Sequence, residues 1–75
     1  MTKLAEQVID FIGNREVKKS EVISKFSGRG TKMSEVTFVN YLLFMIRDGL
    51  LTEKIYYKDN GDFDRNKGKT LIVVK

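Results

Sequence analysis

The chain has 75 residues, 41% of them hydrophobic, and a net charge of +4, which suits one small domain. It contains no cysteine or histidine, so disulfides, zinc sites and the common catalytic triads are excluded. No apolar run approaches the roughly 18 residues of a membrane span, and the first residues do not resemble a signal peptide. We expect residues 1–75 to form one cytoplasmic domain that is not an enzyme and needs no cofactor.

The first part of the chain predicts two helices separated by a short strand. Thr2 is a good cap for a first helix that Gly13 ends, and Val17 suits a very short strand. Ser20 is the predicted cap of a second helix that ends at Phe26. The apolar stripe of the first helix comprises Leu4, Val8, Phe11 and Ile12 with Ala5 and Ile9 beside it, and the second helix buries Val22, Ile23 and Phe26.

The positive charge is concentrated around the second helix. Residues 14–32 contain six basic and two acidic residues, and the rest of the chain is balanced. The turn at residues 27–33 contains two glycines, but its spacing does not match a phosphate-binding NTPase loop. The excess charge favours contact with a phosphate backbone, and the alternative is a solvated surface without a partner.

A third, strongly apolar helix is predicted from Ser34 to Asp48. Its predicted core face is Val39, Leu42, Leu43 and Ile46, with Val36 and Phe38 at the margins. The opposite face comprises Ser34, Thr37, Asn40, Tyr41, Phe44, Arg47 and Asp48. Thr37, Asn40 and Tyr41 have side chains that suit base edges, or they are ordinary surface residues. An aromatic ring at Phe44 should be covered, either by the hairpin that follows or by a second subunit.

The last third of the chain predicts a β-hairpin. Gly49 ends the third helix, and two strand-like runs, residues 52–58 and 69–75, flank a polar loop at residues 59–68. Phe63 in that loop either anchors it to the domain or makes an external contact. A calcium loop starting at Asp62 is excluded because Lys67 and Val73 occupy positions that need Gly and Glu.

Residues 18–75 resemble the winged helix-turn-helix family of transcription regulators. The likeness rests mainly on the segment after Tyr41, in which an apolar helix, Asp-Gly-Leu-Leu, a strand, a polar loop and a strand follow one another. The size and composition are similar to those of the short regulators of archaeal viruses and plasmids. The resemblance implies an α+β fold of three helices and a two-stranded wing, with the third helix in the major groove of DNA and the wing on the backbone or minor groove.

The charge distribution and the resemblance together predict a set of DNA contacts. The phosphate contacts expected around the second helix are Lys18, Lys19, Lys25 and Arg29. The resemblance adds Lys32, Ser34, Thr37, Asn40 and Tyr41 near the third helix, and Arg65, Lys67 and Lys69 in the wing. Two features depart from the family pattern, namely the three aspartates of the wing and the aromatic character of the third helix.

We therefore expect a sequence-specific regulator that binds double-stranded DNA, acts as a homodimer and has no metal site. One alternative is a protein-interaction module that uses the Tyr41 and Phe44 face. A second is binding of RNA or single strands, with Tyr56, Tyr57 and Phe63 as stacking surfaces.

Overall fold

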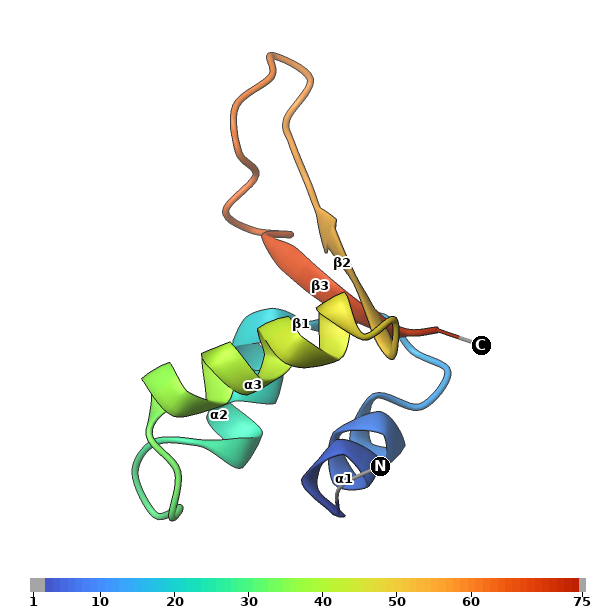
Figure 1. The fold of residues 1–75 in the computed structure, drawn as a ribbon. Coiled ribbons are helices and arrows are strands. Elements are labelled where there is room, and N and C mark those ends of the chain that lie inside the picture. Colours follow the sequence, from blue (N-terminus) through green and yellow to red (C-terminus); the bar gives the residue numbers. More distant parts are fainter. Residues whose placement is uncertain (1–2, 75) are drawn as a thin grey trace.

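The computed structural model describes residues 3–74, which form three helices and a three-stranded antiparallel sheet. The elements in chain order are α1 (Lys3–Ile12), β1 (Val17–Lys18), α2 (Lys19–Phe26), α3 (Glu35–Arg47), β2 (Leu51–Ile55) and β3 (Lys69–Val73). Figure 1 shows the helices gathered at one end and the β2–β3 hairpin projecting away from them. The arrangement is α+β and compatible with a winged helix. The predicted cap Thr2 lies outside the described residues.

The sheet has the order β1-β3-β2, so the last strand lies in the middle. The predicted strand near Val17 is present and pairs antiparallel with β3, where Val17 lies opposite Leu71 and Lys18 opposite Thr70. The other edge of β3 pairs with β2, from Leu51 opposite Val73 to Ile55 opposite Lys69. This register joins the start of α2 to the base of the hairpin, two segments that are far apart in the sequence.

The core lies between the three helices and the adjacent face of the sheet. Its buried apolar side chains are Ala5, Val8, Ile12, Val17, Val22, Phe38, Leu42, Met45, Leu51 and Leu71. The predicted stripe of α1 is confirmed, and Gly13 ends this helix with a φ of 59°. Phe26 stacks on Phe38 at a centroid distance of 5.6 Å, which fixes the short α2 against α3.

The predicted core face of α3 was wrong by part of a turn. Phe38, Leu42 and Met45 are buried, whereas Leu43 is 50% exposed and Val36 is 72% exposed. Almost every residue from Phe38 to Ile46 is apolar, so the sequence alone contains two overlapping stripes. Contact with α2 and the sheet selects the stripe that contains Phe38, and the other remains on the surface.

The boundaries of α2 and α3 follow from local hydrogen bonds. Ser34 caps α3 because its hydroxyl accepts the amide N–H of Thr37 at 3.2 Å. At the other end, Leu50 N–H donates to the Met45 carbonyl and Gly49 N–H to the Ile46 carbonyl, a Schellman arrangement in which Gly49 has a φ of 82°. The predicted cap of α2 was wrong, because Ser20 lies within the helix and Lys18 occupies the cap position.

The hairpin, which we call the wing (residues 51–73), has a longer loop than the sequence predicted. Strand β2 ends at Ile55, so residues 56–68 connect the two strands. Part of this loop remains paired, since Tyr57 and Phe63 form an isolated antiparallel bridge. None of the helices in the described part of the chain has the length and apolar character that a membrane crossing requires.

Candidate nucleic-acid interface

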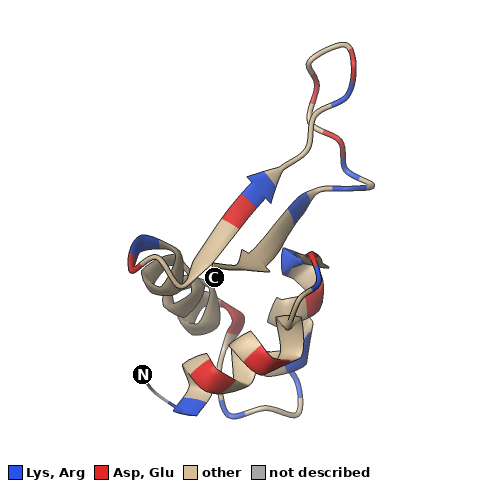
Figure 2. Ribbon diagram, turned by 90° about the vertical axis from the view of Figure 1, so that its right-hand side faces the viewer, with Lys and Arg blue, Asp and Glu red and all other residues tan. Residues whose placement is uncertain are grey.

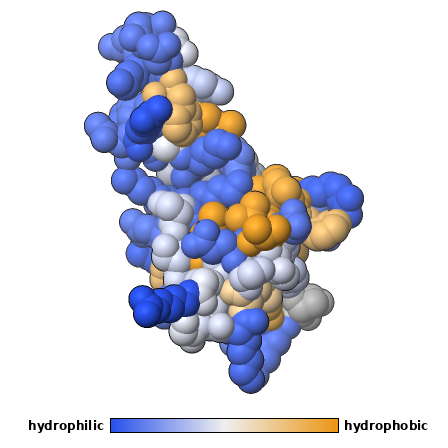
Figure 3. Space-filling view, turned by 90° about the vertical axis from the view of Figure 1, so that its left-hand side faces the viewer, coloured by the Kyte–Doolittle hydropathy of each residue, from blue (hydrophilic) through white to orange (hydrophobic). Residues whose placement is uncertain are grey.

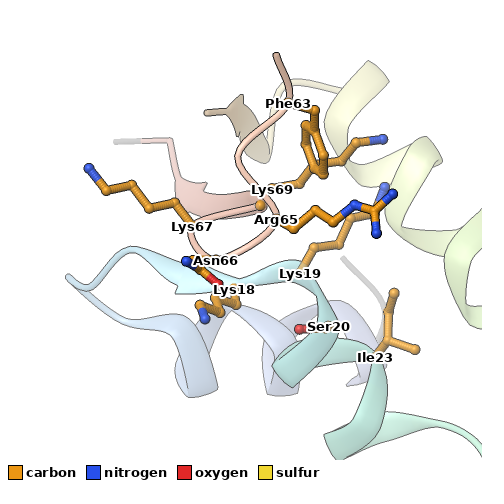
Figure 4. Close-up of a pocket in the computed structure, with 10 residues that line it drawn as sticks. Lys18, Lys19, Ser20, Ile23, Phe63, Arg65, Asn66, Lys67 and Lys69 are labelled. Atoms are coloured by element: carbon orange, nitrogen blue, oxygen red, sulfur yellow. The ribbon is translucent and has the colours of Figure 1, made fainter. Parts of the chain in front are cut away.

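A hollow of about 490 Å³ lies between the start of α2 and the returning arm of the wing. We call it the basic groove, and its cations are Lys18, Lys19, Arg65, Lys67 and Lys69. Ser20, Ile23, Phe63, Asn66 and Gly68 complete the lining, so the described residues around the groove include no aspartate or glutamate. Figure 4 shows these side chains reaching the hollow from two segments, the β1–α2 junction and residues 63–69. The arrangement can hold polyanions.

The sheet register produces this concentration of charge. Lys18 lies opposite Thr70 in the β1–β3 pair, and Lys69 lies opposite Ile55 in the β2–β3 pair. The first residues of α2 therefore adjoin the first residues of β3. Because α2 begins at Lys19, the positive end of its helix dipole lies beside the same cations.

One of the five cations is paired within the protein. The Lys19 ammonium is 2.8 Å from Glu53 on β2, and both side chains are largely buried, with exposures of 15% and 20%. This ion pair fixes α2 to the sheet and reduces the positive field of Lys19. Within residues 3–74, Lys18, Arg65, Lys67 and Lys69 form no ion pair, and the charge of Lys67 acts on the nearby Asp64 carboxylate. The sequence gives no signal for Glu53 in this role, because the pairing depends on the fold.

A second group of side chains fixes the wing to β1 on the other side of the sheet. The Tyr56 hydroxyl donates to Glu16, and the Thr70 hydroxyl donates to the same carboxylate at 2.9 Å. These two hydrogen bonds, that of Tyr56 above all, lower the pKa of Glu16. Lys54 and Lys67 lie over the Tyr56 ring, at 4.9 and 5.6 Å from its centroid. Tyr56 is thus a structural residue, and its ring already has partners.

The acidic residues of the wing lie outside the basic groove. Figure 2 shows both signs of charge on the wing, with acids toward its tip. The Asp64 carboxylate accepts the backbone N–H groups of Asn66 and Lys67 at 2.9 and 3.1 Å, which lowers its pKa. Asp62 accepts a hydrogen bond from Asn60 at the tip. The three aspartates of the wing, which would repel phosphates, are therefore absent from the described lining of the groove.

Three of the predicted cationic DNA contacts are separate from the groove. Lys25 lies over the Phe11 ring, 6.0 Å from its centroid, on the side of α1. Arg29 and Lys32 are exposed in the α2–α3 connection. Of the basic residues around α2, Lys18 and Lys19 therefore line the groove and the others lie outside it. The remaining cations of the groove belong to the wing.

The predicted base contacts on α3 have different environments. Ser34 and Thr37 are exposed but bonded to each other, with 2.9 Å between their hydroxyl oxygens. Asn40 is exposed and lines a shallow hollow with Leu43, Phe44 and Arg47. Tyr41, which the sequence placed on the solvent face, is half-buried and packs against the core. Thr37 and Asn40 therefore remain available for base contacts, and Tyr41 is largely withdrawn.

The solvent face of α3 is more apolar than a groove-reading helix needs. Val36, Leu43 and Phe44 are 72%, 50% and 52% exposed, and the Arg47 guanidinium lies 4.8 Å from the centroid of the Phe44 ring. The wing does not cover Phe44, so one of the two covers suggested by the sequence is absent. Figure 3 shows apolar side chains gathered below the wing, which is itself mostly hydrophilic with a smaller apolar patch.

Comparison with family models, with curated proteins and with solved structures found no match to this chain.

Proposed function

We propose that this protein is a winged-helix transcription regulator that binds double-stranded DNA. The observation that supports this proposal is the basic groove, where five cations from two distant segments meet without an acid in the described lining. Lysine and arginine side chains bind the phosphate backbone whatever the base sequence, and they position the protein on the duplex. Such a regulator would act in the cytoplasm.

In this mode the wing follows the backbone or the minor groove, and the N-terminal half of α3 enters the major groove. The exposed side chains available there are Thr37 and Asn40. An asparagine amide can both donate to and accept from an adenine edge, so Asn40 is the residue that we expect to discriminate between bases. Lys32 and Ser34, at the start of the same helix, would contact the adjacent phosphates.

We also propose that two copies bind DNA together. A module of this size covers only about 600–1,000 Å² of its surface on DNA, and a second copy extends both affinity and site length. The C-terminal half of α3 presents Leu43 and Phe44, half-exposed, next to Arg47. Thr37 is separated from these side chains along the helix, whereas Asn40 borders the same hollow and would lie at the boundary between the partner and the DNA.

A second candidate function is a protein-interaction module, and the exposed face of α3 is the observation that favours it. Val36, Leu43 and Phe44 would then dock a different protein, and the basic groove would be a solvated surface. The two functions respond differently to salt. Phosphate contacts weaken steeply as salt is added, whereas an apolar interface does not.

The test is selection from a pool of random 25-base-pair duplexes, followed by titration of the selected site and its single-base variants. We expect one enriched motif, and we expect Asn40→Ala to cost about 1–3 kcal/mol at one base pair while binding to unrelated duplexes stays unchanged. Lack of duplex binding even at low salt would refute the proposal and favour the interaction module.

A further inference from the structure

The wing carries two aromatic rings that the fold does not use. Phe63 is 41% exposed and Tyr57 is 63% exposed. Among the described residues, neither ring stacks on another ring or lies under a cation, in contrast to Phe26, which packs on Phe11 and Phe38, and Tyr56 with its two lysines. Exposed rings in a polar loop contribute little to folding, so their position relative to the basic groove becomes informative.

The two rings emerge from neighbouring positions on one face of the wing. Tyr57 and Phe63 form a bridge pair, and the hydrogen bonds on either side of it join Lys58 N–H to the Asp62 carbonyl and Asp64 N–H to the Tyr56 carbonyl. A pair flanked in this way is the non-hydrogen-bonded kind, in which the two side chains point to the same face and lie close together. The rings therefore form one apolar surface.

This surface adjoins the cations. Phe63 lines the basic groove together with Arg65 and Lys69, and the same ring lines a second hollow with Arg65, Lys58, Asn66 and Asp62. In Figure 4 the Phe63 ring lies beside the Arg65 and Lys69 side chains. Side chains two residues apart in an extended segment lie on the same face, so Tyr57, just after β2, lies on the same face as Ile55. Ile55 lies opposite Lys69 in the β2–β3 pair. Phe63, Tyr57, Arg65 and Lys69 thus lie on one side of the wing, whereas Lys67 reaches the ring of Tyr56.

We propose that Phe63 and Tyr57 form a stacking site for an unpaired base, and that the groove holds the backbone on which that base is carried. Cations that follow a backbone, next to aromatic faces that accept any base, are the combination by which proteins hold single-stranded DNA. The inference rests on the proposed DNA binding and specifies its partner, a duplex with a single-stranded extension. The paired part occupies the groove, and the first unpaired base stacks on Phe63.

The experiment compares three DNA ligands at one salt concentration. They are a blunt 20-base-pair duplex, the same duplex with a six-nucleotide adenine tail, and the same duplex with a six-nucleotide abasic tail. The abasic tail adds equal charge without bases, so it removes the electrostatic contribution. We expect the adenine tail to tighten binding by about 5- to 100-fold over the blunt duplex, and the abasic tail to leave it within about twofold.

The matched variant is Phe63→Leu, which keeps an apolar side chain but removes the aromatic face. It should abolish the gain from the adenine tail, measured as the ratio of its affinities for the tailed and the blunt duplex, with Tyr57→Leu giving a smaller loss. A 2-aminopurine at the first unpaired position should lose fluorescence on binding to the parent protein but not to Phe63→Leu. Circular dichroism melts of both variants confirm that they are folded.

The inference is overturned if the adenine and abasic tails bind alike, or if Phe63→Leu keeps the full gain. Those outcomes leave the proposed function intact so long as the blunt duplex binds. If the blunt duplex fails to bind while the adenine tail binds through Phe63, the stacking site stands and binding of double-stranded DNA is the part that is wrong.

Discussion

The hydroxyl of Tyr56 donates a hydrogen bond to the carboxylate of Glu16, which lies 40 residues earlier in the chain. Tyr56 is the first residue after β2, and Glu16 immediately precedes β1, so this bond joins the root of the wing loop to the opposite edge of the sheet. Thr70 on the central strand donates to the same carboxylate. The orientation of the wing, and with it the geometry of the basic groove, depends on this contact.

The pKa of Glu16 offers a direct test of that contact. Since the hydrogen bonds from Tyr56 and Thr70 favour the ionised carboxylate, we expect the pKa of Glu16 to lie below its ordinary value of 4.5 in the folded protein. The lowered pKa stabilises the folded protein at pH values above the pKa that Glu16 has in the unfolded chain. This stabilisation is lost as the pH falls through the pKa of Glu16 in the folded protein. Carboxyl-detected NMR titration should show the pKa rising toward 4.5 in Tyr56→Phe. An unchanged titration would contradict the contact.

The orientation of α3 is tested by two adjacent leucines. Leu42 is fully buried and Leu43 is half-exposed, although the sequence predicted both in the core. Leu42→Ala should lower the free energy of unfolding by about 2–5 kcal/mol, and Leu43→Ala by less than about 1 kcal/mol. Urea denaturation of the two variants measures this difference. Equal losses at the two positions would mean that the helix is rotated from the described orientation.

The features of the fold that could be predicted from the sequence are those that depend on local interactions. Gly13 and Gly49 end their helices through hydrogen bonds within a few residues, so the order of elements could be predicted. The rotation of α3 could not, because Leu43 and Met45 are equally apolar and only contact with α2 and the sheet distinguishes them. The basic groove depends on β3 pairing with β1, which brings Lys69 near Lys18. Such a pairing between distant segments has no local signal.

The ion pair between Lys19 and Glu53 predicts a gain of function. Glu53 holds the Lys19 ammonium at 2.8 Å and supplies negative charge next to the groove. Glu53→Gln should therefore tighten binding to duplex DNA and steepen its salt dependence by up to about one unit of log K against log salt. Glu6→Gln on α1 makes the same change in net charge far from the groove. Identical effects of the two variants would show that only net charge matters.

Self-association through α3 is tested at Phe44. If a second copy covers the exposed half of this ring, burial of each Phe44 contributes roughly 1–1.5 kcal/mol to the dimer, and Phe44→Glu should give a monomer that remains folded. Sedimentation equilibrium measures the mass, and Tyr57→Glu, which changes a more exposed ring on the wing, is the control that should stay dimeric. A parent protein that is monomeric at all concentrations would refute the proposed dimer.

The central claim is that the basic groove binds the DNA backbone, and the salt dependence of duplex affinity tests it most directly. The double variant Arg65→Ala with Lys69→Ala removes two unpaired groove cations, whereas Lys3→Ala with Arg15→Ala removes the same charge from the side of α1. Each lost phosphate contact lowers the slope of log K against log salt by about 0.9. We predict a slope reduced by about two units for the groove variant and nearly unchanged for the control. Equal slopes for the two double variants would contradict the claim.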